Sequence, residues 1–429
     1  MKEILRNLAI VIGLFLVILF LYSFQKLHSN DYSAYSIQED IFAINKLTLQ
    51  NHWQSDSKKT LKNTSKIQTI FEVNDTFTWL REPLLMRLPD GSLFCEIYTG
   101  GRGDGHKGNV VAAVRSDDDG KTWSELEIVK ALKDTGCWAS SVFVDDQTGY
   151  IFWYTMDKSR NLMTHANARI LCTGADGRNF EHDRRPRGNW DTEQCLDIRR
   201  GVRLRNGKIL LPVAWKEPAN EAESKQLVDA DGTLARRWGN FGGKTLLDKI
   251  SLVGVVEPNA DFTEFTRFGR IHHLTPDGAL PSVPFFENQI AELSDGSLVM
   301  LIRADMTNRL WRSESRNQGR TWTDPVKTDI PNPGSKALVI NLPDGRIVLF
   351  HNPNEKDLDD SSPEVGRKYR TPLEMWVSDD DMKTWNRKET LVAAPALAQY
   401  PDGFYDPDKG CIFLVWEDDR KVYFRRIAI

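Results

Sequence analysis

The chain has 429 residues, a net charge of −4 and 10% aromatic residues. No basic stripe stands out, which argues against a nucleic-acid partner. Its 29 glycines, 19 prolines and 13 tryptophans, with little helical periodicity, indicate an all-β, turn-rich protein long enough to bury a large core. We find no glycine-rich phosphate loop and no His/Cys cluster at metal-ligand spacing, so we expect neither a cofactor nor a metal.

The N-terminal segment is apolar. Leu8–Phe24 contains no charge and no proline, and Lys2 and Arg6 precede it. Its length favours an uncleaved signal anchor over residues 1–26, with a cleaved signal peptide and secretion as the alternative. The positive flank places the N-terminus in the cytoplasm and the rest of the chain outside it, in the periplasm or at the cell surface. Residues 27–65 are polar, and we interpret them as a stalk.

One eight-residue pattern, Ser-x-Asp-x-Gly-x-Thr-Trp, occurs three times. Short polar side chains bond back onto such a turn, glycine permits the dihedral angles, and the tryptophan anchors the turn below. Three copies in one register indicate a repeated supersecondary unit. The copies are Ser116–Trp123, Ser315–Trp322 with Asn317 in the Asp position, and Ser378–Trp385 with Met382 in the Gly position.

A second repeat has the form of an apolar strand end, an Asp/Asn-Gly turn and another strand. Six such units of about 60 residues predict a six-bladed β-propeller over residues 66–429, with a β-sandwich as the alternative. The widest interval between the glycines predicts an insertion between Glu217 and Lys249. The turn glycines are Gly91, Gly149, Gly207, Gly296, Gly345 and Gly410.

The five cysteines are irregularly spaced. Cys95 and Cys411 lie in apolar runs and are expected to be buried thiols. A bridge from Cys172 to Cys195 or to Cys137 is possible but is not supported by spacing.

The three eight-residue copies resemble the aspartate boxes of the sialidase (neuraminidase) superfamily, and the resemblance runs from about Phe71 to the C-terminus. It implies a six-bladed propeller. The boxes also occur in propellers that are not enzymes, so function has to come from the site. Sialidases bind a substrate carboxylate with three arginines, and they use an aspartate as acid/base and a tyrosine nucleophile activated by a glutamate.

The resemblance implies six site residues here. Arg81 lies in Arg81-Glu82-Pro83, where the family has isoleucine in place of Glu82. The other two arginines are Arg303, at the end of the strand after a Leu-x-Asp-Gly turn, and Arg370, before the last box. The catalytic candidates are Asp104 in a glycine-rich loop, Glu287 at the opening of a strand, and Tyr400, which precedes a proline where the family usually has serine.

The residue types suit the chemistry. A fork of arginines binds a carboxylate in a bidentate manner that lysine cannot copy. A neutral phenol avoids the repulsion that a carboxylate nucleophile would meet beside an anionic sugar, and sialidases with a tyrosine nucleophile are a known exception among glycosidases.

Three functions compete. The first is an exo-acting, retaining glycoside hydrolase of sialidase type that releases a terminal anionic sugar from glycans. The second is a propeller glycosidase with another sugar specificity, as Glu82, Pro401 and the insertion suggest. The third is a non-catalytic glycan-binding propeller, which would have no need of Asp104, Glu287 and Tyr400. We expect a monomer whose partners are a glycan and, through the N-terminal helix, a membrane.

Overall fold

A computed structural model describes residues 66–156, 167–190, 196–226, 249–273, 285–305, 307–356 and 368–429. The predicted anchor (1–26) and stalk (27–65) lie outside these ranges and stay predictions. Within the described ranges, no helix is both long enough and apolar enough to cross a membrane.

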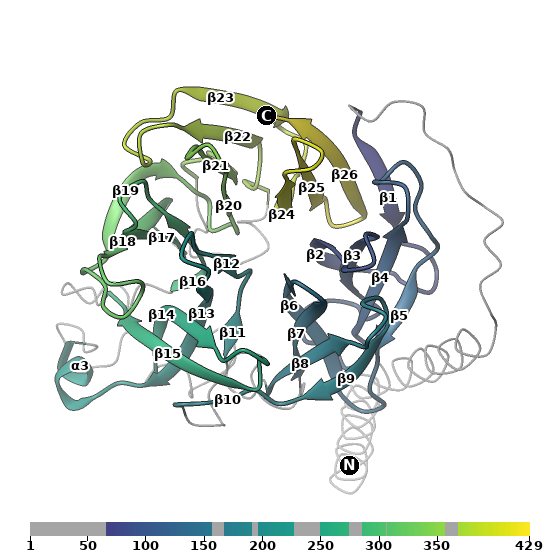
Figure 1. Ribbon diagram of the computed structural model, residues 1–429, viewed down its shortest axis with the longest axis horizontal. Helices are drawn as coiled ribbons and strands as arrows, with labels where there is room; N and C mark the ends of the chain where they lie inside the picture. The colour runs from purple at the N-terminus through teal and green to yellow at the C-terminus, as the bar shows by residue number, and fades with distance from the viewer. Residues whose placement is uncertain are drawn as a thin grey trace, which may run out of the picture. The chain divides into compact units, whose positions relative to one another are not determined.

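Six sheets surround a central axis, so the predicted six-bladed propeller is confirmed and the sandwich alternative is wrong (Figure 1). The strand pairs of the described residues are antiparallel except for the short parallel pair of β10 with β15. The first blade consists of β2 (Leu80–Arg87), β3 (Leu93–Thr99), β4 (Val110–Ser116) and β5 (Glu127–Lys130). The second consists of β6 (Gly136–Asp145), β7 (Thr148–Met156), β8 (Asn167–Thr173) and β9 (Phe180–Arg184). The third consists of the short strands β10 (Arg187–Gly188), β11 (Asp197–Ile198) and β12 (Val202–Arg203) with β13 (Ile209–Pro218), β14 (Lys249–Pro258) and β15 (Glu264–Ile271).

The fourth blade consists of β16 (Phe285–Glu292), β17 (Leu298–Ala304), β18 (Arg309–Ser315) and β19 (Val326–Pro331). The fifth consists of β20 (Leu338–Asn341), β21 (Ile347–His351), β22 (Leu373–Ser378) and β23 (Arg387–Val392). The sixth joins both ends of the described chain: β1 (Gln68–Glu72) pairs with β26 (Lys421–Ala428), which continues to β25 (Cys411–Glu417) and β24 (Gln399–Asp406). This pairing closes the ring and leaves no open junction between first and last blades.

The three boxes form the turns that sequence predicts. In the first, Ser116 Oγ accepts a hydrogen bond from the Gly120 amide at 2.8 Å, and Asp118 accepts from the Thr122 amide at 2.8 Å. In the third, Met382 adopts a φ of 60° in the glycine position while its side chain packs in the core. The local hydrogen bonds of the turn therefore hold a backbone conformation that L-residues rarely adopt.

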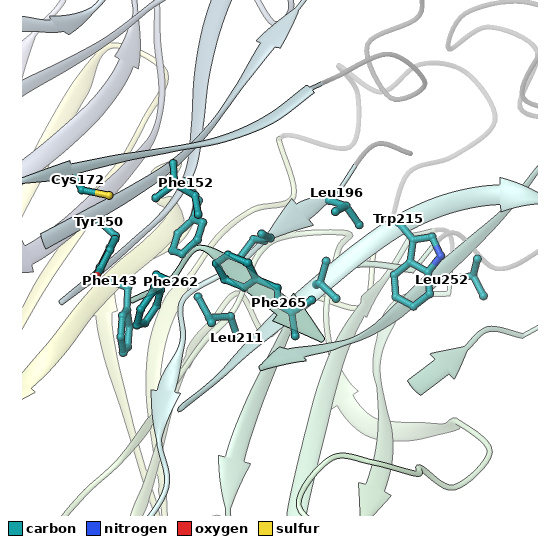
Figure 2. Close-up of a cluster of buried hydrophobic side chains, with 14 of the residues drawn as sticks. Phe143, Tyr150, Phe152, Cys172, Leu196, Leu211, Trp215, Leu252, Phe262 and Phe265 are labelled. Carbon is teal, nitrogen blue, oxygen red and sulfur yellow. The ribbon is translucent and has the colours of Figure 1, made fainter. Parts of the chain in front are cut away.

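Apolar side chains pack between neighbouring blades. Figure 2 shows the contact of the second and third blades, where Tyr150 and Phe262 stack with ring centroids 4.3 Å apart. Phe152 of β7 and Phe265 of β15 meet edge to face in the same cluster. Burying such aromatic surface is the main favourable contribution to the fold and fixes how the blades are arranged around the axis.

The predicted insertion falls after β13 and before β14 in the sequence, and its residues 227–248 lie outside the described residues. β13 ends at Pro218, α3 spans Glu221–Gln226, and β14 begins at Lys249. Cys95 and Cys411 are buried free thiols as expected. Cys137 and Cys172 are also free, so no bridge joins them, and Cys195 lies outside the described residues.

Candidate active site

The inner strands of three blades carry the same local distortion. Glu82 in β2, Glu287 in β16 and Tyr400 in β24 have φ values of 50°, 39° and 53°. Each lies at a register shift against the second strand of its blade. Such a bulge redirects one side chain, and positive φ at bulky residues is concentrated at functional sites. The distortion therefore marks equivalent positions around the axis as a candidate site.

Tyr400 is the meeting point of the three predicted arginines. The guanidinium carbons of Arg81 and Arg370 lie 5.7 Å and 5.1 Å from the centroid of its ring. Arg303 Nη1 lies 3.5 Å from its hydroxyl. All three arginines are at most 8% exposed. Residues up to 289 positions apart in sequence thus gather around one phenol.

Arg303 also binds two carboxylates. Its Nη1 donates to Glu287 Oε2 at 2.7 Å, and its Nε and Nη2 donate to the two oxygens of Asp305 at 2.7 Å and 3.1 Å. Among the described residues, no hydrogen bond joins Glu287 directly to Tyr400. The Arg303 guanidinium stands between them, whereas a glutamate that activates the tyrosine would be expected to contact its hydroxyl. Hydrogen bonds between catalytic groups often form only once substrate is bound.

The other two arginines have N–H donors without a hydrogen-bond partner among the described residues. Arg370 donates to Gln399 Oε1 at 2.9 Å and to the Gly334 carbonyl at 3.0 Å, and Arg81 Nη2 lies 3.1 Å from Asp419. The Nε atoms of Arg81 and Arg370 are buried and have no hydrogen-bond partner in the described part of the chain. Since a buried donor without a partner is unfavourable, these atoms are available to a bound anion.

Asp104 lies exposed in the loop after β3. The loop is tied to the site by Tyr98, whose hydroxyl accepts hydrogen bonds from the Gly105 amide and from Asn109. Burial lowers the pKa of Arg81, but the negative charges of Glu417, Asp104 and Asp419 outweigh it and hold that pKa above its usual value. The Asp104 carboxylate is therefore electrostatically coupled to the site.

The pKa values of two carboxyl groups of the site are shifted in opposite directions. Burial raises the pKa of Glu287, but Arg303 and Arg199 more than offset this and hold it at about 2. Burial raises the pKa of Glu417 to about 7, with Arg81 as the opposing influence. Glu287 is thus ionised at neutral pH, while Glu417 titrates there.

Sequence reasoning left some residues of the site without a role. Arg199, between β11 and β12, bonds to Glu82, and Lys336, before β20, lies 3.4 Å from Glu82 Oε1 and 5.7 Å from the Tyr400 ring centroid. Arg199 precedes a strand that resembles the third blade of the superfamily, and Glu82 in place of isoleucine was a second signal, because a buried carboxylate requires cationic partners. Among the described residues, no three His, Cys, Asp or Glu side chains are grouped to hold a metal.

The BNR repeat-like domain family matches residues 91–413. This chain belongs to that family, within the sialidase superfamily. A sialidase of Micromonospora viridifaciens is 24% identical over 345 residues, which are 76% of this chain and 48% of the relative. The chain therefore spans about half the length of that curated relative.

Several solved structures have the same fold as this chain. The Hadza microbial sialidase Hz136 superposes with a TM-score of 0.61 at 15% identity, covering 82% of this chain and 66% of the other. The intramolecular trans-sialidase from Ruminococcus gnavus, in complex with oseltamivir carboxylate, gives 0.58 at 13% identity, covering 85% and 97%. A protein of unknown function from Dyadobacter fermentans gives 0.59 at 13%, covering 86% and 99%. At these identities the likeness concerns the fold alone.

Proposed function

We propose that this chain is an exo-acting, retaining glycoside hydrolase of sialidase type that removes a terminal anionic sugar from glycans. The observation that carries the proposal is the gathering of Arg81, Arg303 and Arg370 around the Tyr400 phenol. Buried guanidinium groups in such a cluster repel one another, and an anionic ligand would relieve that repulsion.

The substrate carboxylate would bind first to the donors that the protein leaves without partners. The Nε atoms of Arg81 and Arg370 meet this condition. Arg303 would join them by exchanging its hydrogen bonds with Asp305 and Glu287 for the substrate anion. Planar guanidinium forks suit a carboxylate better than a point charge does.

Tyr400 would then attack the anomeric carbon. Its phenol is neutral before attack, so it does not repel the substrate carboxylate, and Glu287 would accept its proton when Arg303 moves to the substrate. Asp104, on the exposed loop, would protonate the departing glycosidic oxygen and then activate water. Two displacements at one carbon retain the configuration.

The test is a panel of aryl glycosides assayed with the full chain and with Tyr400→Phe. We expect turnover of a glycoside of an anionic sugar such as sialic acid, and a loss of about 10³-fold or more in Tyr400→Phe with the fold intact, because one hydroxyl contributes only about 1 kcal/mol to stability. Asp104→Asn should impair substrates with poor leaving groups more than activated ones. Turnover by Tyr400→Phe at the wild-type rate would refute the mechanism.

A glycosidase for another sugar is the second candidate. It is favoured by Glu82, which puts a buried carboxylate where the superfamily has isoleucine, and by Asp305, which occupies the Arg303 fork. Turnover of an uncharged aryl glycoside in preference to the anionic ones would select it.

A further inference from the structure

A line of buried charges runs between three blades at the candidate site. Arg199 Nη1 donates to Glu82 Oε1, and Arg199 Nη2 lies 3.6 Å from Glu287 Oε1. We call Glu82, Arg199 and Glu287 the axial ion chain. It begins in the first blade, passes through the third and ends in the fourth.

Stability does not account for this chain of charges. Glu82 and Arg199 are each 2% exposed, and Glu287 is 6% exposed. The desolvation of ion pairs buried so deeply offsets most of their attraction, so apolar residues of similar size would serve the fold as well or better. Groups that are kept charged in such a place are candidates for a functional role.

Arg199 is held rigidly. Its Nε and Nη2 donate to Asp197 Oδ2 at 2.9 Å and 2.5 Å, and its Nη1 also donates to the Ser140 carbonyl at 3.3 Å. Its guanidinium carbon lies 5.9 Å from the Trp138 ring centroid. Contacts from three blades therefore fix the one cation, besides Arg303, that forms an ion pair with Glu287 among the described residues.

We propose that Arg199 is a positioning residue for the proposed reaction: it fixes the Glu287 carboxylate and keeps it ionised beside Tyr400, and Glu82 anchors Arg199 from another blade. This inference rests on the proposed function. When Arg303 moves to the substrate carboxylate, Arg199 is the cation that continues to hold Glu287. Without it, the carboxylate would lose its second partner at the moment when it must accept a proton.

The charged groups around Glu287 set the expected pH dependence. Arg303 of β17 bonds to it directly, Arg199 faces it from between β11 and β12, and Lys336 acts from before β20. Burial raises the pKa of Asp197 in β11 to about 6, against the opposing effect of Arg199 and with smaller contributions from Glu82 and Glu287. Glu82, Asp305 and Tyr400 complete the surroundings through Arg199 and Arg303.

Because a cation near a carboxylate lowers its pKa, losing Arg199 should raise that of Glu287 by about one unit or more. Losing the negative charge of Glu82 should not raise it. The two changes thus differ in the direction of their effect.

The experiment measures kcat and KM of the full chain from pH 2 to 8 with an aryl glycoside of an anionic sugar, so that the range reaches the pKa of about 2 that Glu287 has in the wild type. Arg199→Gln should shift the acidic fall of kcat/KM upward by about one pH unit or more and lower kcat about tenfold, with KM changed less than about twofold. Arg199→Lys keeps the charge and should restore the acidic fall to near the wild-type pH. Glu82→Gln should lower kcat several-fold without an upward shift.

Arg115→Gln is the matched control, since Arg115 is an equally buried arginine whose partner, Glu127 at 2.5 Å, lies beside the first box. The inference is overturned if Arg199→Gln loses thermal stability and kcat as the control does while its acidic fall stays in place. Where Arg199→Gln does not fold, Glu82→Gln decides: an unchanged kcat overturns the inference, and a several-fold loss without an upward shift of the acidic fall supports it. Absence of wild-type turnover would refute the proposed function and this inference with it. Wild-type turnover that depends on Tyr400 but not on Arg199 would refute only the inference.

Discussion

Two regions of the propeller, the boxes and the strands near the axis, use the same backbone conformation for different purposes. Non-glycine residues with positive φ occur at both, as Gln318 and Met382 in the boxes and as Glu287 and Tyr400 near the axis. In the boxes, side chains from the same turn satisfy the backbone. At the axis, each redirected side chain contacts residues from other blades.

The hydrogen bonds show the same contrast. Ser315, Asn317 and Thr321 bond to one another and to the box backbone within seven residues. At the axis, Arg81, Arg370 and Glu417 keep buried polar atoms without a partner among the described residues. These side chains of the box have their hydrogen-bond partners within the box. The residues near the axis keep donors and acceptors without partners in the described part of the chain, as a binding site requires. Substitutions at the axis should therefore change activity, and substitutions in the boxes should change stability.

The largest of the three effects that test this contrast should come from an arginine at the axis. Arg370→Lys removes the planar fork and the donor that is free for a substrate anion, so we expect kcat/KM for an anionic substrate to fall about 100-fold. Steady-state kinetics check this. Arg346→Lys, in an exposed turn where Asp344 is the one ion-pair partner of Arg346 among the described residues, should leave kcat/KM unchanged. An equal loss of kcat/KM in both variants would contradict the contrast between the axis and the rest of the propeller.

A pH-dependent effect should come from Glu417. Its pKa of about 7 in the fold lies above the value of 4.5 expected for the unfolded chain, so the folded state binds more protons between these pH values. Stability should therefore be highest at the acidic end of this window and fall by about 2–3 kcal/mol as pH rises through 7. Thermal denaturation of wild type and Glu417→Gln at pH 5 and pH 8 tests this. In the variant, stability should differ much less between pH 5 and pH 8 than in the wild type. If the difference is as large as in the wild type, groups other than Glu417 cause it.

The smallest effect should come from a box. Ser378 Oγ accepts from the Met382 amide at 2.9 Å, so Ser378→Ala leaves a buried N–H without its partner and should cost about 1–2 kcal/mol. Chemical denaturation measures this loss, while kcat/KM should remain at the wild-type value. A variant that keeps its stability but loses activity would show that the boxes influence the site.

The sequence by itself determined the blades. Each box and each Asp/Asn-Gly turn is local, because its hydrogen bonds join residues a few positions apart, so the spacing of the repeats was enough to predict six blades. The same local rules predicted an insertion between Glu217 and Lys249, most of which lies outside the described residues. Resemblance to the sialidase superfamily added the order of Arg81, Arg303, Arg370 and Tyr400 along the chain.

Only the tertiary structure decided how those residues meet. Arg303 stands between Glu287 and Tyr400, and Asp305 occupies its fork, which no spacing could have shown. The pairing of Glu82 with Arg199 joins residues 117 positions apart. The energy of a charge that has no partner nearby in sequence depends on the side chains that other blades place beside it. Closure of the ring by β1 and β26, rather than any local pattern, therefore decides what each axial side chain contacts.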